Sequence, residues 1–174
     1  WDLLNLKDFC ITSNVKTFRN ETVTSNYYRK FFVENSLPNV YTAFMFFKKC
    51  DISKEIFNMA EKIFQSPSEY FSILTKNDIK PTTDLVFSLA IKLLDYYDFC
   101  IEDTLPTFVH MKPKIQNLKI NIDESLWANQ IPYTFDNNGI CKINTFKQNF
   151  PLHYHDKNFI TDDMIKIMED IYAS

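Results

Sequence analysis

The sequence predicts an α/β protein in which a mixed sheet is flanked by helices. Three observations support this fold class. The stretch from Val40 to Phe47 is apolar except for Thr42 and has the length of a buried strand. Apolar residues at helical spacing follow it, and a later Asp-Asn-Asn-Gly run is typical of a tight turn between two strands. Strands mixed with helices in this order indicate α/β or α+β architecture.

Length and composition limit the class of protein further. A chain of 174 residues predicts one domain spanning residues 1–174. The apolar fraction of 45% argues against disorder. A net charge of −3 speaks against nucleic acid as a partner, because a general nucleic-acid binder needs a basic surface to displace counterions.

Two further patterns bear on location. No apolar run approaches the roughly 18 residues of a transmembrane helix, and the opening WDLLNLKD has neither the charged region nor the cleavage site of a signal peptide. The four cysteines are spread along the chain without a CxxC pair, which favours free thiols in a reducing compartment. We therefore expect a cytoplasmic protein with no membrane partner.

The first third of the chain contains one clear strand. Residues 1–9 form an apolar entry segment, and residues 10–37 are polar without a clear period, which predicts a long loop or short irregular elements. Pro38 marks a break. Residues 40–47 then predict a buried strand.

Three helices follow this strand. Residues 52–64 place their apolar side chains on one helical face. The run Ser66-Pro67-Ser68-Glu69 has the pattern of a capping box and predicts a short second helix. A third helix is expected from Thr83, as N-cap, to Leu94, with Asp84 in its first turn.

The remaining elements are shorter. Residues 107–111 predict a strand, and the lysine-bearing loop KPKIQNLK follows it. Residues 131–146 predict a hairpin around residues 136–139. A last helix is expected from Thr161, and its apolar face is formed by Ile165, Met168, Ile171 and Tyr172.

The chain has a single glycine, Gly139. This excludes the GxxxxGK phosphate loop and the GxGxxG dinucleotide fingerprint, both of which need several glycines. If a phosphate group is bound, side chains must bind it.

His110 ends a predicted strand and is followed by Lys112 and Lys114. This combination suits a metal-diphosphate ligand, because the imidazole can hold the metal and the ammonium groups can hold phosphate oxygens. On pattern alone, a half-buried histidine bonded to the backbone is the preferred interpretation.

Two other patterns also have a plain structural interpretation. His153 and His155 lie on one face if extended and could chelate a metal with a third ligand, but a surface strand before the last helix is preferred. Asp84 is explained most simply by its place at a helix start.

The segments "ITSNV", "LPNVYTAFMFFKK" and "PTFVHMK" carry a resemblance to a known family. Together with the acid near the start of the chain and the Asp that opens a helix, they resemble the C-terminal portion of a GT-A glycosyltransferase of the glycogenin-like retaining kind. They are most similar to glycosyltransferase-like proteins of marine tailed phages.

The resemblance implies a role for several residues. Asp2 would be the last aspartate of the metal motif, and His110 would be the second metal ligand. Residues 40–47 would form a central strand covered on both faces. Asn39, Thr42 and Ala43 would line the sugar pocket, and Asp84 would be the acid on the acceptor side. Lys112 or Lys114 would contact the diphosphate.

The sequence departs from the family pattern in three places. The first aspartate of the metal motif is absent, Ala43 or Phe44 stands where the family has a glycine, and the histidine element is reduced to His110-Met-Lys-Pro-Lys114. The N-terminal nucleotide-binding half of the family also has no counterpart here, so we expect this chain to be a fragment.

The resemblance thus implies transfer of a sugar from a nucleotide-diphosphate sugar to a hydroxyl acceptor, with Mn²⁺ or Mg²⁺ as the cofactor. The catalytic residues would be Asp84 and Asn39, acting in a bacterial cytoplasm or in the host cell of a virus. The alternative is a non-catalytic, phage-associated interaction or structural protein that retains the fold, which the degraded motifs favour.

Overall fold

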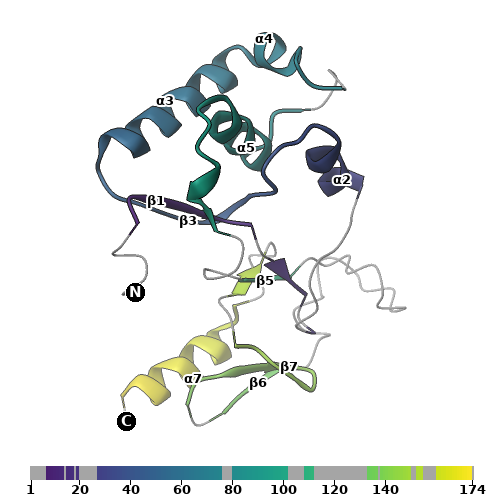
Figure 1. The fold of residues 1–174 in the computed structure, drawn as a ribbon. Coiled ribbons are helices and arrows are strands. Elements are labelled where there is room, and N and C mark those ends of the chain that lie inside the picture. Colours follow the sequence, from purple (N-terminus) through teal and green to yellow (C-terminus); the bar gives the residue numbers. More distant parts are fainter. Residues whose placement is uncertain are drawn as a thin grey trace. The chain divides into compact units, whose positions relative to one another are not determined.

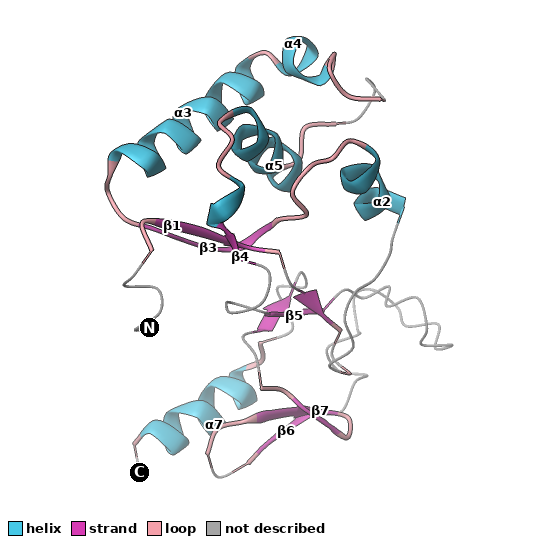
Figure 2. Cartoon of the chain, in the orientation of Figure 1, coloured by secondary structure: helices cyan, strands magenta, loops and turns pink. Residues whose placement is uncertain are grey.

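The computed structural model describes residues 7–13, 15–17, 19, 27–75, 80–101, 108–111, 133–136, 138–149, 152–154 and 160–173 (Figure 1). The chain forms two compact units. Unit 1 comprises Trp1–Asn14 and Val23–Thr107, and unit 2 comprises Val15–Thr22 and Phe108–Ser174. Helices and small sheets occur together, which confirms the predicted mixed α/β class (Figure 2). The single domain over residues 1–174 stays a prediction.

Unit 1 contains a three-stranded sheet in the order β3-β1-β4. The central strand β1 (Phe9–Thr12) is buried at all four residues, pairs antiparallel with β3 (Tyr41–Phe47) and runs parallel to β4 (Cys100–Ile101). The strand predicted at residues 40–47 is therefore present, but its predicted central position is wrong. Within the described part of the sheet β3 pairs with β1 alone, and most of its residues are only partly buried.

Four α-helices accompany this sheet in the part of the unit that the structure describes. They are α2 (Tyr27–Glu34), α3 (Asp51–Gln65), α4 (Pro67–Phe71) and α5 (Thr83–Leu93), and a 3₁₀ turn (Tyr97–Phe99) leads into β4. In Figure 1, α3 and α5 lie over the same face of the β1–β3 pair. The three helices predicted between residues 52 and 94 are confirmed.

Two sequence predictions are refined by the structure. Of the two alternatives expected for segment 10–37, a long loop or short irregular elements, the long loop is wrong, because β1 extends into the segment and a two-residue strand β2 (Val15–Lys16) and α2 lie within it. The N-cap of α5 is Thr82 and not Thr83, since the Thr82 hydroxyl accepts a bond of 3.3 Å from the Leu85 N–H.

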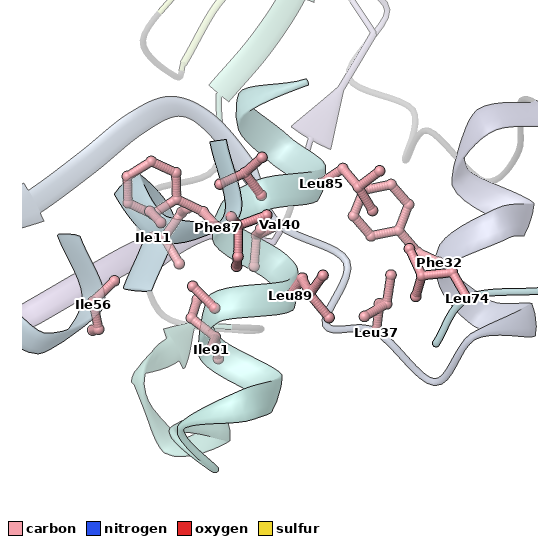
Figure 3. Packing of buried hydrophobic residues seen from close by; sticks show 14 of the residues in the cluster. Ile11, Phe32, Leu37, Val40, Ile56, Leu74, Leu85, Phe87, Leu89 and Ile91 are labelled. Atoms are coloured by element: carbon pink, nitrogen blue, oxygen red, sulfur yellow. The ribbon is translucent and has the colours of Figure 1, made fainter. Parts of the chain in front are cut away.

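Helix α5 supplies the centre of the hydrophobic core. Seven successive residues of this helix are buried, so no side of it faces solvent between Leu85 and Ile91. Figure 3 shows Phe87, Leu89 and Ile91 among side chains contributed by the strands and the other helices. Full burial of each large aliphatic side chain contributes roughly 1.5–3 kcal/mol, so this helix accounts for much of the stability of the unit.

Polar contacts tie α5 to the segment that precedes β3. The buried Ser88 hydroxyl donates to the carbonyl oxygen of Pro38. The Lys92 ammonium lies 2.6 Å from the Asn35 carbonyl oxygen and donates to it. The Asn35 side chain in turn exchanges two hydrogen bonds with Thr75, of 2.8 and 3.1 Å, so the end of α2 is held as well.

The described residues of unit 2 form two small sheets and a helix. Strand β5 (Phe108–Met111) lies between β2 and β9 (Leu152–Tyr154), and both neighbours run parallel to it. The second sheet joins β6 (Tyr133–Phe135), β7 (Cys141–Ile143) and β8 (Phe146–Lys147) as an antiparallel meander. The predicted strand at 107–111 and the hairpin at 131–146 are confirmed.

The turn between β6 and β7 has the chemistry that its sequence predicts. The Asp136 carboxylate accepts bonds of 3.0 Å from the backbone N–H groups of Asn138 and Ile140. Gly139 has a φ of +73°, which L side chains rarely adopt. A Cβ at Gly139 would lie 3.5 Å from Cγ2 of Ile171, so the turn lies against the C-terminal helix α7 (Asp162–Tyr172).

Helix α7 begins where the sequence predicts, with the Thr161 hydroxyl accepting from the Met164 N–H at 3.3 Å. Its predicted apolar face is only partly correct. Met164 is buried, whereas Ile165, Met168 and Tyr172 are exposed.

Replacing Leu89 with alanine should lower the free energy of unfolding by about 2–5 kcal/mol, because the buried side chain leaves a cavity in the core. Leu93→Ala is the matched control, since this leucine lies one turn further along α5 and is 41% exposed. Its cost should stay under about 1 kcal/mol. Urea denaturation measures both, and equal costs would contradict the position of α5 in the core.

Hydrogen bonds from the backbone, first from Ile140 and then from Asn138, hold the pKa of Asp136 below its usual value, and Lys147 and Lys142 act in the same direction. The folded-state pKa is lower than the unfolded one, so this carboxylate stabilises the hairpin above about pH 4. That contribution is lost as the pH falls through the folded-state pKa. Carboxyl NMR titration should place the Asp136 midpoint below that of an unfolded-chain aspartate, whereas an ordinary midpoint would contradict the turn geometry.

Candidate functional site

A bulge in β3 marks the candidate site. The register between β1 and β3 is regular from Phe9 to Ile11, which pairs with Met45, but the next residue, Thr12, pairs with Tyr41. Residues 42–44 of β3 therefore have no register partner among the pairs that join β1 to β3. Bulges of this kind redirect backbone groups and occur often next to functional sites.

The bulge leaves the Thr42 N–H directed at Asp84. The Thr42 backbone nitrogen donates to Oδ1 of Asp84 at 2.8 Å, and the Thr42 hydroxyl lies 2.7 Å from the same oxygen. The hydroxyl oxygen is also 2.8 Å from the Thr83 hydroxyl. A hydroxyl has one proton and an ionised carboxylate can only accept, so the Thr42 proton goes to Asp84 and Thr83 donates to Thr42.

The start of α5 positions these groups. Thr82 caps the helix, which places Thr83 and Asp84 in its first turn. A carboxylate there interacts favourably with the helix dipole. Asp84 thus stabilises the helix start and fastens it to the bulged strand, and the side chains of Thr42 and Asp84 remain partly accessible.

The other residues that the resemblance assigns to the sugar pocket lie close by in the chain. Ala43 is exposed within the bulge, and Asn39 is exposed just before β3, between the buried residues Pro38 and Val40. The structure therefore brings Thr42 and Asp84 into direct contact, with Ala43 next to Thr42 in β3 and Asn39 two residues before the strand, all within unit 1.

Of the residues expected at the metal and the diphosphate, the structure describes the backbone of His110 alone. His110 belongs to β5 of unit 2, where its register partner on β9 is His153. Asp2, Lys112, Lys114 and His155 lie outside the described residues. Within the part of the chain that the structure describes, no group of three or more His, Cys, Asp or Glu residues is arranged to hold a metal ion.

The four cysteines are free thiols in the structure. Burial raises the pKa of Cys141 to about 11, and burial also raises the pKa of Cys10. Both thiols are therefore protonated at neutral pH and are poor nucleophiles or metal ligands.

Comparisons with known proteins gave no relative: no protein-family model, no curated protein and no solved structure matches the chain. Among the helices that the structure describes, none is long and apolar enough to cross a membrane.

Two features of the site were not predicted from the sequence. The bulge has no local signal, because it depends on how β3 pairs with a strand about thirty residues earlier. The register pairing of His110 on β5 with His153 on β9 is equally non-local, although both histidines fall in short apolar runs that could have been paired.

The contact between Thr42 and Asp84 predicts a measurable coupling. Thr42→Val removes the hydroxyl and keeps the shape, and Asp84→Ala removes the acceptor. In a double-mutant cycle the two should couple by about 1–3 kcal/mol in the free energy of unfolding, because the bond involves a charged group. Ser68→Ala, at an exposed position of α4, is the control that should show no coupling to Asp84→Ala. Additivity of Thr42→Val and Asp84→Ala would contradict the contact.

Proposed function

We propose that this chain is a GT-A glycosyltransferase-like protein, similar to the C-terminal portion of that family, which moves a sugar from a nucleotide-diphosphate sugar to a hydroxyl acceptor. The observation that carries the proposal is the contact between Thr42 and Asp84. The resemblance places these residues on the donor and acceptor sides of one reaction centre, and 42 positions of sequence separate them.

In the proposed reaction each of these residues has its own role. Asn39 and Thr42 contact the hydroxyl groups of the donor sugar, and the bulge keeps the Thr42 backbone out of the sheet ladder. Asp84 is oriented by two hydrogen bonds to Oδ1 and accepts a bond from the acceptor hydroxyl. A positioned carboxylate of this kind aligns the attacking oxygen, and alignment is a large part of the rate gain in group transfer.

The two candidate ions, Mn²⁺ and Mg²⁺, differ in how well they suit the proposed ligands. Asp2 offers carboxylate oxygen and His110 offers imidazole nitrogen, and Mg²⁺ strongly prefers oxygen. Mn²⁺ accepts both, so we favour Mn²⁺ over Mg²⁺. When bound, it would neutralise charge on the leaving diphosphate, together with Lys112 or Lys114.

Calorimetry with Mn²⁺ and a panel of nucleoside diphosphates tests the donor site. Wild type should bind one of them only with Mn²⁺, and His110→Ala should lose that binding because it removes a metal ligand. Asp84→Asn is the matched variant: it should bind the nucleotide as wild type does, since Asp84 acts on the acceptor side. Failure of the folded wild-type chain to bind any nucleotide would refute the proposal for this chain.

The second candidate is a non-catalytic interaction or structural protein. The exposed apolar side chains of α7 favour it, because Ile165, Ile167, Met168 and Tyr172 are 44%, 39%, 39% and 85% exposed. Apolar surface of this kind is typical of contact with another macromolecule.

A further inference from the structure

The outer edge of β3 carries backbone groups directed away from its sheet. In the order β3-β1-β4, β3 pairs with β1 on one side, and no described strand lies on the other side. The Lys48 N–H donates to the Asp8 carbonyl oxygen at 2.8 Å, which makes this register position a hydrogen-bonded pair. Because hydrogen-bonded and non-hydrogen-bonded pairs alternate along an antiparallel ladder, Phe47 and Met45 direct their N–H and C=O groups away from β1.

The composition of β3 makes this edge a surface for another strand. The strand spans seven residues, Tyr41–Phe47, and none of them is charged or a proline. Proteins commonly protect long apolar edges with charges or proline, because such edges pair with other chains. The first charge after the strand is Lys48, at its end. Backbone hydrogen bonding therefore selects an extended segment as the partner of this edge.

The sequence of β3 is symmetric about Met45, which points to a second copy as that segment. Phe44 and Phe46 stand on either side of Met45. If two copies run antiparallel with Met45 opposite Met45, Phe44 of each copy lies opposite Phe46 of the other, and the small, exposed Ala43 lies opposite Phe47, which is 51% exposed. We propose that the edge of β3 pairs with the same edge of a second copy of this chain, in the antiparallel register centred on Met45.

Both faces of the strand suit this pairing. Met45 packs against the core, and the Phe47 ring centroid lies 4.9 Å from that of Phe57 in α3, so these two side chains belong to the face that the helices cover. Alternation assigns Phe44 and Phe46 to the opposite face, where both are partly exposed. Aromatic side chains directly opposite each other on antiparallel strands stabilise the pair. Dimerisation thus buries apolar surface as well as backbone polar groups.

The charges and the other sheet edge favour a closed dimer. In the antiparallel arrangement Lys48 and Lys49 of the two copies lie at opposite ends of the new pair, so these like charges do not meet. A two-fold pairing uses the β3 edge of both copies, and the opposite edge of the sheet is β4, whose two residues give a further strand little to pair with. The inference does not rest on the proposed function, since the pairing needs neither Asp84 nor a nucleotide.

Sedimentation velocity of the whole chain over a series of concentrations tests the dimer. Wild type should show a reversible equilibrium between monomer and dimer. Met45→Pro removes an N–H that points away from β1, a position where an edge strand tolerates proline, and should weaken dimerisation at least about tenfold. Val33→Glu is the control, because Val33 is an apolar residue of α2 that is 76% exposed and lies outside this edge. It should leave the dissociation constant unchanged.

Two double variants test the register and do not depend on proline. In Phe44→Glu/Phe46→Lys, each glutamate faces a lysine of the other copy, whereas in Phe44→Glu/Phe46→Glu it faces another glutamate. The first variant should dimerise about tenfold more tightly than the second, because the symmetric dimer contains each cross-strand pair twice. Far-UV circular dichroism checks that all variants fold.

Four results would overturn the proposal. They are a wild type that stays monomeric at every concentration, open-ended aggregation in place of a dimer, equal dissociation constants for the two double variants, and a dimer that is lost in Met168→Lys while the β3 variants keep it. The last result would assign the dimer to the exposed apolar side chains of α7.

Discussion

The burial of α5 along seven successive residues is the constraint on which the rest of unit 1 depends. A helix without a solvent face must have its neighbours on every side, so α3, the sheet and the segment before β3 all pack against it. Three polar contacts are spaced along this helix: Asp84 at its start, Ser88 in its middle and Lys92 near its end. Burial of apolar side chains supplies most of the stability of unit 1. The three polar contacts determine which neighbouring segment packs against each turn of α5.

The bulge in β3 follows from the same constraint. Strand β3 must satisfy the ladder with β1 and also reach the start of α5, and one regular strand cannot do both. Residues 42–44 are released from the register, and the Thr42 N–H pairs with a carboxylate in place of a strand carbonyl. A charged acceptor makes a stronger hydrogen bond than a neutral carbonyl. Replacing a strand carbonyl by the Asp84 carboxylate therefore costs little stability, and it fixes the relative positions of Thr42, Thr83 and Asp84.

The sequence predicted those features that depend on neighbouring residues. Pro67 after Ser66, the helical spacing of residues 52–64 and the Asp136–Gly139 turn are local signals, and each matches an element of the structure. The N-cap of α5 is Thr82 where Thr83 was predicted, because two adjacent threonines carry the same local capping signal. Strand β1 was missed because four residues, FCIT, are too short to show a period. The central place of β1, the bulge, the Thr42–Asp84 contact and the His110–His153 pair all depend on long-range pairing, which local patterns do not encode.

Unit 2 is discontinuous in the chain, because β2 precedes nearly all of unit 1 while β5 and β9 follow it. During synthesis β2 therefore emerges long before its partner strands exist. Unit 1 can complete its core once Ile101 has been made, since all three strands of its sheet and α5 are then present. Throughout that interval the β2 segment has no partner strand. Because β2 is only two residues long, it offers other chains a short edge to pair with, so its risk of causing aggregation is low.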